Sequence, residues 1–194
     1  MYYYISGQLV EATPSFAVID CGGVGYQLEV TLNTYSQIKD QQTVRLLVHE
    51  IIREDAHLLF GFYQAEERDM FRLLLGVNGV GAASARVLLS SLTVEELQEA
   101  ILSQNVKRIQ SAKGIGAKTA QRIALELHDK VGGLAGGRTP DFGMGQQGNV
   151  EEAAQALVML GFAKNAVDKV LAAVAKENAS ATVEELIKQA LQKL

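Results

Sequence analysis

Two copies of a short glycine motif constrain the fold of this chain more than any other feature. Gly79-Val80-Gly81 and Gly114-Ile115-Gly116 lie 35 positions apart, and a stretch with the apolar spacing of a helix follows each of them. A helical pattern also precedes each motif. The repeated unit is therefore helix, glycine hairpin, helix, and it predicts an all-helical domain over residues 64–131.

Such hairpins suit the binding of a phosphate. At the start of the second helix the backbone N–H groups point outward, and the helix dipole favours an anion there. Glycine is needed because a Cβ would restrict both the turn and the approach of a bulky group. Two hairpins can hold two nearby phosphates of one backbone, so recognition should depend on shape and salt rather than on base identity.

The charge of the chain must be distributed unevenly if it binds nucleic acid. The formal net charge is −4, but five basic residues and no acidic ones lie between Ala100 and Leu125, around the second hairpin. From the two motifs and this basic island we predict a DNA-binding set made up of Gly79, Val80, Gly81, Arg86, Lys107, Arg108, Gly114, Ile115, Gly116, Lys118, Thr119 and Arg122.

Residues 1–63 predict a small five-stranded β-barrel of the OB type. Five segments rich in β-branched and aromatic residues are separated by turn residues. Three basic residues stand against seven acidic ones here, which disfavours a phosphate-binding groove on the barrel. Glu54 and Asp55 lie in the turn before the last strand, where they form either an ordinary solvated turn or an acidic tip that repels phosphate.

Residues 132–148 contain seven glycines and no apolar periodicity, which predicts a flexible linker. Three helical stripes follow and predict a three-helix domain over residues 149–194. So small a tethered module suits docking better than catalysis. We predict its partner-binding face at Val167, Leu171 and Val174, although the same stripe must also supply the core of the bundle. The whole chain is thus an α+β multidomain protein.

Two nucleotide-binding signatures fail on detail. Gly114–Thr119 resembles the phosphate-binding loop of ATPases, but Ala112 and Ala117 stand where that loop needs glycine, and a helix rather than a strand precedes it. Ser84 occupies the last glycine position of the dinucleotide-binding fingerprint. An intrinsic NTPase is therefore disfavoured.

No arrangement of nucleophiles or metal ligands emerges from the sequence. The three histidines are scattered, and the single cysteine, Cys21, can form neither an intramolecular disulfide nor a zinc site by itself. We expect no active site, no cofactor and no metal. Cysteine usage and the lack of a long apolar run favour a protein of the reducing cytoplasm that makes no membrane contact.

Taken together, these motifs resemble the RuvA family of Holliday-junction-binding subunits of the bacterial branch-migration complex. The likeness covers nearly the full length, through Arg53–Phe62, Asn78–Gly81, Gly114–Ala120 and the tethered C-terminal bundle. Tandem helix-hairpin-helix motifs alone occur in many DNA repair proteins. Another repair scaffold, or a nuclease subunit, is therefore the alternative, as is a protein-only scaffold that uses its hairpins for packing.

The resemblance implies a homotetramer, or an octamer of two tetramers, that holds a four-way DNA junction open during homologous recombination and DNA repair. Glu54 and Asp55 would form an acidic pin at the crossover. The C-terminal domain would contact the hexameric RuvB ATPase, and the RuvC resolvase is a further candidate partner. The chain itself would hydrolyse nothing.

The chain departs from the family pattern at both hairpins. The first hairpin of the family often continues Gly-Pro-Lys, whereas Ala82 and Ala83 follow Gly81 here, so that a cation is missing and Arg86 is the candidate replacement. The second often has a preceding proline and two lysines, where this chain has Lys113 and Lys118. Side-chain charge should therefore be concentrated at the second hairpin.

Overall fold

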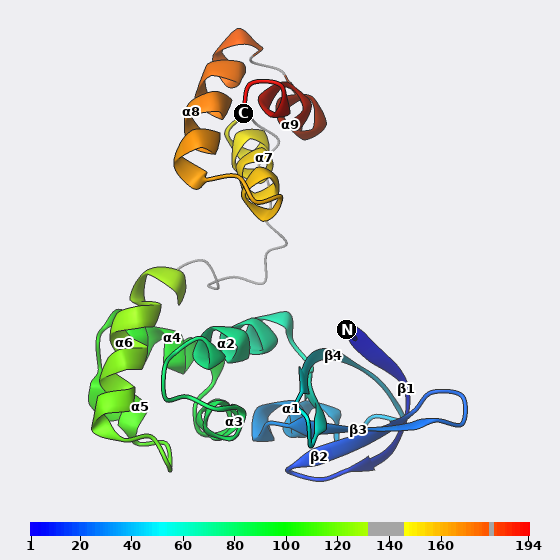
Figure 1. Ribbon diagram of the computed structural model, residues 1–194. Coiled ribbons are helices and arrows are strands. Elements are labelled where there is room, and N and C mark those ends of the chain that lie inside the picture. The colour runs from blue at the N-terminus through cyan, green and yellow to red at the C-terminus, as the bar shows by residue number, and fades with distance from the viewer. Residues whose placement is uncertain (132–145, 179–180) are drawn as a thin grey trace. The chain divides into compact units, whose positions relative to one another are not determined.

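The computed structural model describes residues 1–131, 146–178 and 181–194 (Figure 1). The chain forms two compact units, Met1–Gly137 and Arg138–Leu194, and each is considered by itself. Most of the predicted linker, residues 132–145, lies outside the described residues. Its last three positions correct the prediction, because helix α7 already begins at Gln146.

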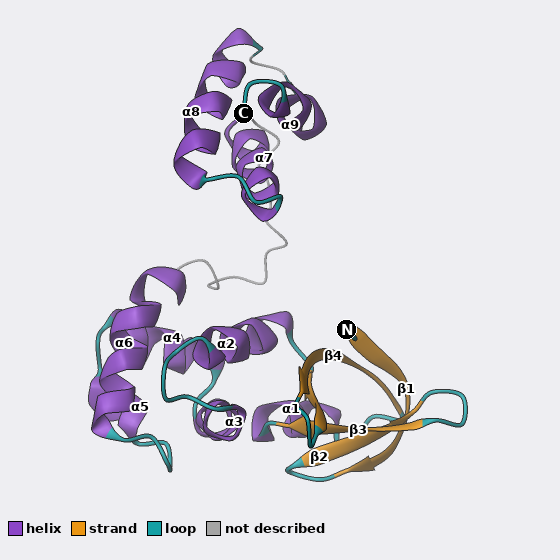
Figure 2. Ribbon diagram, in the orientation of Figure 1, coloured by secondary structure: helices purple, strands orange, loops and turns teal. Residues whose placement is uncertain are grey.

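The N-terminal part of the first unit is a closed barrel with the strand order β1-β2-β3-β5-β4 (Figure 2). Strands β3 and β5 pair in parallel, and the other neighbours are antiparallel. This topology confirms the OB-type barrel. The strands are β1 (Tyr4–Ala12), β2 (Phe16–Asp20), β3 (Gly25–Val30), β4 (Thr43–Ile52) and β5 (His57–Phe62).

A short helix that the apolar periodicity did not predict, α1 (Leu32–Ile38), connects β3 and β4. Seven residues are too few for a helical repeat to be recognised, and only two of them are buried. The one usable signal is Thr31, whose hydroxyl accepts a hydrogen bond from Thr34 N at 3.0 Å and caps the helix.

Five helices form the central domain, and their positions confirm the predicted helix-hairpin-helix pairs. A capping box is also present: the Thr93 hydroxyl accepts from Glu96 N, and the Glu96 carboxylate accepts from Thr93 N. The helices are α2 (Ala65–Leu75), α3 (Ala82–Ser91), α4 (Val94–Leu102), α5 (Val106–Gln110) and α6 (Ala117–Val131).

The barrel and the central helices share one apolar core. Phe60 and Phe62 of β5 pack on Phe71 of α2, with ring centroids 5.1 and 5.0 Å apart, and all three belong to the cluster that fills the helical domain. Gly61, between Phe60 and Phe62 in β5, packs closely against the core of the barrel. A Cβ on Gly61 would lie 2.9 Å from Leu46 Cδ1, so no larger residue fits without displacing the barrel core.

The second unit is a bundle of α7 (Gln146–Met159), α8 (Lys164–Glu177) and α9 (Val183–Leu191). Val167, Leu171 and Val174 lie in its core and are at most 1% exposed. This corrects the predicted partner-binding face, because these side chains hold the bundle together and are not accessible to a partner.

A buried carboxylate joins the barrel to the helices. Glu67 of α2 is almost fully buried and accepts hydrogen bonds from the hydroxyls of Thr31 (2.5 Å) and Thr34 (2.6 Å). The Thr34 hydroxyl in turn accepts from the backbone N–H of Tyr63 at 3.1 Å. Burial raises the pKa of Glu67, and the two hydroxyl donors oppose that shift.

We expect Thr34→Val to lower the free energy of unfolding by about 2–4 kcal/mol, because it removes a donor to a buried carboxylate and the acceptor of a backbone N–H. The loss should grow as the pH rises through the raised pKa of Glu67, since the carboxylate is then charged and most needs its donors. Urea unfolding on both sides of that pKa measures the effect.

The matched control is Thr43→Val, which makes the same change at the exposed start of β4. That variant should alter stability by no more than about 0.5 kcal/mol. Equal losses in the two variants, or a Thr34→Val loss that does not vary with pH, would contradict the structural role assigned to Glu67.

Candidate nucleic-acid interface

The two glycine hairpins have the same backbone conformation. Gly79 has φ 91° and Gly114 has φ 88°, a region in which a side chain would be strained. The residue after each glycine is buried, Val80 at 7% exposure and Ile115 at 5%. Val80 N donates to Val77 O at 3.0 Å, and Ile115 N donates to Ala112 O at 3.2 Å. The side chains of Val80 and Ile115 therefore anchor the turns, and their own backbone N–H groups are already hydrogen-bonded within them.

The helices after the hairpins begin without a side-chain cap. The first helical hydrogen bonds run from Ala85 N to Gly81 O and from Ala120 N to Gly116 O, both 2.9 Å. The N–H groups ahead of these two donors have no acceptor within their helices. By contrast, Thr93 and Asn105 cap α4 and α5 with their side chains. Both hairpins thus offer backbone donors to an anion.

The two hairpins lie next to each other. Arg122 of α6 donates from Nη1 to Asn78 O, in the first hairpin, at 3.4 Å. A Cβ built on Gly79 would lie 3.8 Å from Thr119 Oγ1 of α6. Thr119 and Arg122, predicted from the second motif, therefore also border the first. The fold brings both halves of the predicted site into one surface.

The cations of the basic island are not equivalent. Lys107, Lys118 and Arg122 are exposed. Arg108 instead pairs with Glu96, with Nη2 2.8 Å from Oε1. The backbone N–H of Thr93 and the Arg108 guanidinium lower the pKa of the Glu96 carboxyl, so Arg108 faces a charged carboxylate. The basic island contains no acidic residue in the sequence, but the fold places Glu96 of α4 beside it.

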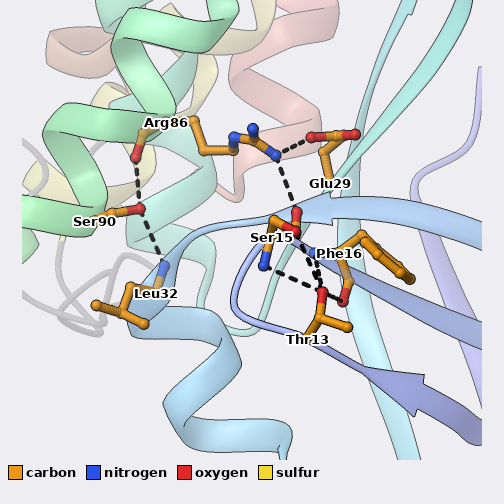
Figure 3. A network of polar contacts seen from close by, with 7 residues as sticks. All are labelled: Thr13, Ser15, Phe16, Glu29, Leu32, Arg86 and Ser90. Carbon is orange, nitrogen blue, oxygen red and sulfur yellow. Dashed lines mark hydrogen bonds and ion pairs between the residues drawn. The ribbon is translucent and has the colours of Figure 1, made fainter.

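The Arg86 side chain is paired with groups of the barrel. Its guanidinium forms an ion pair with Glu29 of β3 and donates to Ser15 O at 3.0 Å (Figure 3). Partial burial lowers the pKa of Arg86. This pairing argues against Arg86 as the replacement for the missing cation of the first hairpin, because its charge is already balanced by Glu29 of the barrel.

Sequence reasoning did not single out Arg53 as a site residue. It lines a groove of about 350 Å³ between the barrel and the start of α3, together with Leu58, Phe60, Gly81–Ala83 and the pair Glu29–Arg86. Only the fold brings Arg53 to the first hairpin, since 28 positions separate it from Gly81.

The acidic turn projects from the barrel as a tight hairpin. Arg53 N donates to Ala56 O at 2.8 Å, and both Glu54 and Asp55 are exposed at the tip. Behind the tip, the His57 ring contacts the Glu50 carboxylate at 2.7 Å, and this contact lowers the pKa of Glu50. The hairpin that carries Glu54 and Asp55 is therefore stabilised by the Arg53–Ala56 hydrogen bond and by the His57–Glu50 contact.

The described parts of the chain contain no group of three or more His, Cys, Asp and Glu residues that could hold a metal ion. Among the described helices none has the length and apolar character needed to cross a membrane.

Comparison with known proteins identifies the family of the chain. Family models match as "RuvA N terminal domain" over residues 1–61, "SAM-like Helix-hairpin-helix tandem" over residues 71–129 and "RuvA, C-terminal domain" over residues 148–194. Curated relatives named Holliday junction branch migration complex subunit RuvA are 45% identical in Christiangramia forsetii, 44% in Bacteroides thetaiotaomicron and 43% in Bacteroides fragilis, covering 100% of both chains. This chain belongs to the RuvA family.

Proposed function

We propose that this chain is the junction-binding subunit of a Holliday junction branch migration complex, and that it holds four-way DNA junctions and recruits the RuvB ATPase. One observation carries the proposal. Two adjacent hairpins of equal conformation, with exposed cations beside them, lie in the same compact unit as an exposed acidic turn. Relatives that match the whole chain bear the corresponding name.

The chemistry of the two features favours a branch point over continuous duplex. Backbone amides and Lys118 attract phosphates without regard to sequence. Glu54 and Asp55 repel them. A straight duplex carries phosphate charges along its whole length, so binding it at the hairpins would also bring some of its phosphates near Glu54 and Asp55. At a junction the strands diverge, which lets the arms meet the hairpins while the acids occupy the centre.

The proposal assigns no reaction to this chain. ATP hydrolysis would belong to the motor, and the hairpins would supply binding and positioning. We further propose a homotetramer, or two tetramers joined as an octamer, because a four-way junction presents four equivalent arms. RuvC as a further partner and the cytoplasm as the compartment remain our expectations from the sequence.

A mobility-shift titration with a four-way junction and a linear duplex of the same sequence, run without the ATPase, tests the proposal. We expect the junction to bind more tightly and the DNA to stay intact. Lys118→Ala and Arg122→Ala should weaken junction binding more than Arg86→Ala, because Arg86 is paired with Glu29. For each phosphate that a variant no longer binds, the slope of the log–log salt dependence should become shallower by about 0.9.

The matched control is Lys130→Ala, which removes the same charge from the far end of α6. It should bind junctions like the unmodified chain. Equal losses for Lys118→Ala, Lys130→Ala and Arg86→Ala would show that only net charge matters. A salt-independent complex, or cleavage of the junction, would overturn the phosphate-binding role itself.

Neutralising the acidic turn tests its repulsive role. The double variant Glu54→Gln/Asp55→Asn should bind linear duplex about tenfold more tightly, because two like charges no longer face the phosphates. Affinity for the junction should change less, so discrimination falls. Glu11→Gln/Asp40→Asn removes equal charge elsewhere on the barrel and should leave duplex affinity unchanged. If the two double variants behave alike, the turn is an ordinary solvated one.

We propose a different docking face on the C-terminal bundle, the exit patch, which consists of Val158, Met159 and Leu160 at the end of α7. Met159 is 88% exposed and Leu160 63%, while Phe162 turns back into the core. Gly161, with φ 101°, makes this reversal possible. Contiguous exposed apolar side chains on a small bundle mark a site for a protein partner.

Leu160→Asp should leave junction binding intact and reduce stimulation of RuvB ATP hydrolysis at least about tenfold, because burial of one leucine contributes about 1.5–3 kcal/mol. Leu191→Asp, the same change at a half-exposed leucine of α9, is the control and should retain most of the stimulation. Equal losses in both would mean that the exit patch is not the docking face.

A further inference from the structure

Arg86 makes the polar contact between α3 and the barrel that lies nearest to the first hairpin. Its guanidinium reaches both the Glu29 carboxylate and the Ser15 carbonyl, and we call these three groups the Arg86 latch (Figure 3). Arg86 stands five positions after Gly81, the N-cap residue of α3. The contacts of Arg86 with Glu29 and Ser15 therefore also restrain α3, the helix that follows the first hairpin.

The barrel side of the latch is rigid. Ser15 O also accepts from Val30 N at 3.1 Å, which ties it to β3. The Thr13 hydroxyl closes the same turn by accepting from Phe16 N at 3.0 Å (Figure 3). Glu29 itself lies in β3, which is paired with β2 and β5. A guanidinium held by this frame has little freedom to move.

Among the described residues, the other polar contacts that hold α3 to the barrel domain lie at the far end of the helix. Ser90 accepts from Leu32 N at 3.0 Å, and Asn33 donates to Leu89 O at 2.6 Å and to Leu92 O at 3.2 Å. These contacts fix the C-terminal turn of α3 on α1. Without the latch, the described contacts would leave the hairpin end of α3 held to the barrel by apolar packing alone.

The latch also borders the groove that separates the first hairpin from the acidic turn. Arg86 and Glu29 line it, as do Gly81 at the hairpin and Arg53 at the base of the turn. Arg53 directly precedes Glu54 and Asp55, so a change in the width of this groove would also change the spacing between the first hairpin and the acids of the turn. Junction discrimination depends on that spacing, because both features must meet the same branch point.

We propose that Arg86 is a positioning residue for junction recognition, and that its pairing with Glu29 and Ser15 sets the spacing between the first hairpin and the acidic turn. Arg86 therefore makes no contact with DNA phosphate. The inference rests on the proposed function for its consequence in DNA binding, but its structural part can be tested without DNA.

A double-mutant cycle separates a latch from a phosphate ligand. Arg86→Gln and Glu29→Gln should each lower the junction-to-duplex affinity ratio about tenfold, and the double variant should be no worse than either alone, because both break one interaction. The salt dependence should stay as steep as in the unmodified chain. The exchanged pair Glu29→Arg/Arg86→Glu should recover part of the ratio.

A phosphate ligand would behave in the opposite way. Arg86→Gln would then weaken junction and duplex binding alike and flatten the salt dependence by about 0.9, and Glu29→Gln would strengthen binding by releasing the guanidinium. That result overturns the proposal, and so do unchanged ratios in both single variants. Arg72→Gln, which removes an exposed charge from α2, is the matched control and should leave the ratio unchanged.

A distance measurement tests the latch directly in DNA-free full-length protein. Spin labels at Glu54→Cys and Ala83→Cys, in a Cys21→Ser background diluted with unlabelled chain, report the spacing across the groove. Arg86→Gln and Glu29→Gln should broaden the distance distribution, whereas Ser90→Ala, at the far end of α3, should not. Unchanged distributions in the latch variants would refute the inference even if the chain binds junctions as proposed.

Discussion

The packing of Phe60 and Phe62 on Phe71 is the interaction on which the rest of the first unit depends. It merges the barrel and the helical domain into one core, so the acidic turn and the glycine hairpins belong to one body. Apolar packing of this kind has little directional preference. The orientation of the helices on the barrel is left to the polar contacts around it, at Glu67, Asn33 and Arg86.

Ion pairs, rather than overall composition, decide which basic side chains of this protein keep an unpaired charge. A chain with a net charge of −4 can present a basic surface because acids neutralise only certain cations. Glu29 forms an ion pair with Arg86, and Glu96 forms one with Arg108. Three other basic side chains are exposed in the helix-hairpin-helix domain, namely Lys107, Lys118 and Arg122. Beside the first hairpin, where Ala82 and Ala83 follow Gly81, the nearby cation is Arg122 of α6, which donates to Asn78 O.

Sequence patterns were most informative where the structure is local. Gly79 and Gly114 are needed for their positive φ. Two helix-capping boxes, Thr93–Glu96 and Thr182–Glu185, each lie within four consecutive residues. Such local features can be recognised from the sequence without knowledge of the fold. Helix α1 was missed because its seven residues, of which only two are buried, show no clear helical period. Val167, Leu171 and Val174 were assigned to a partner because an apolar stripe looks the same whether a partner or the bundle's own helices cover it.

By itself, then, the sequence determined the family, the OB-type barrel, the tandem hairpins and the position of the acidic turn. All of these depend on residue types at short, fixed spacings, which can be recognised in the sequence without any knowledge of tertiary contacts. Only the tertiary structure decided which charges are free, which apolar residues are exposed and which distant residues meet. Arg86 lies 57 positions from Glu29, and only folding brings its guanidinium to that carboxylate, which balances its charge.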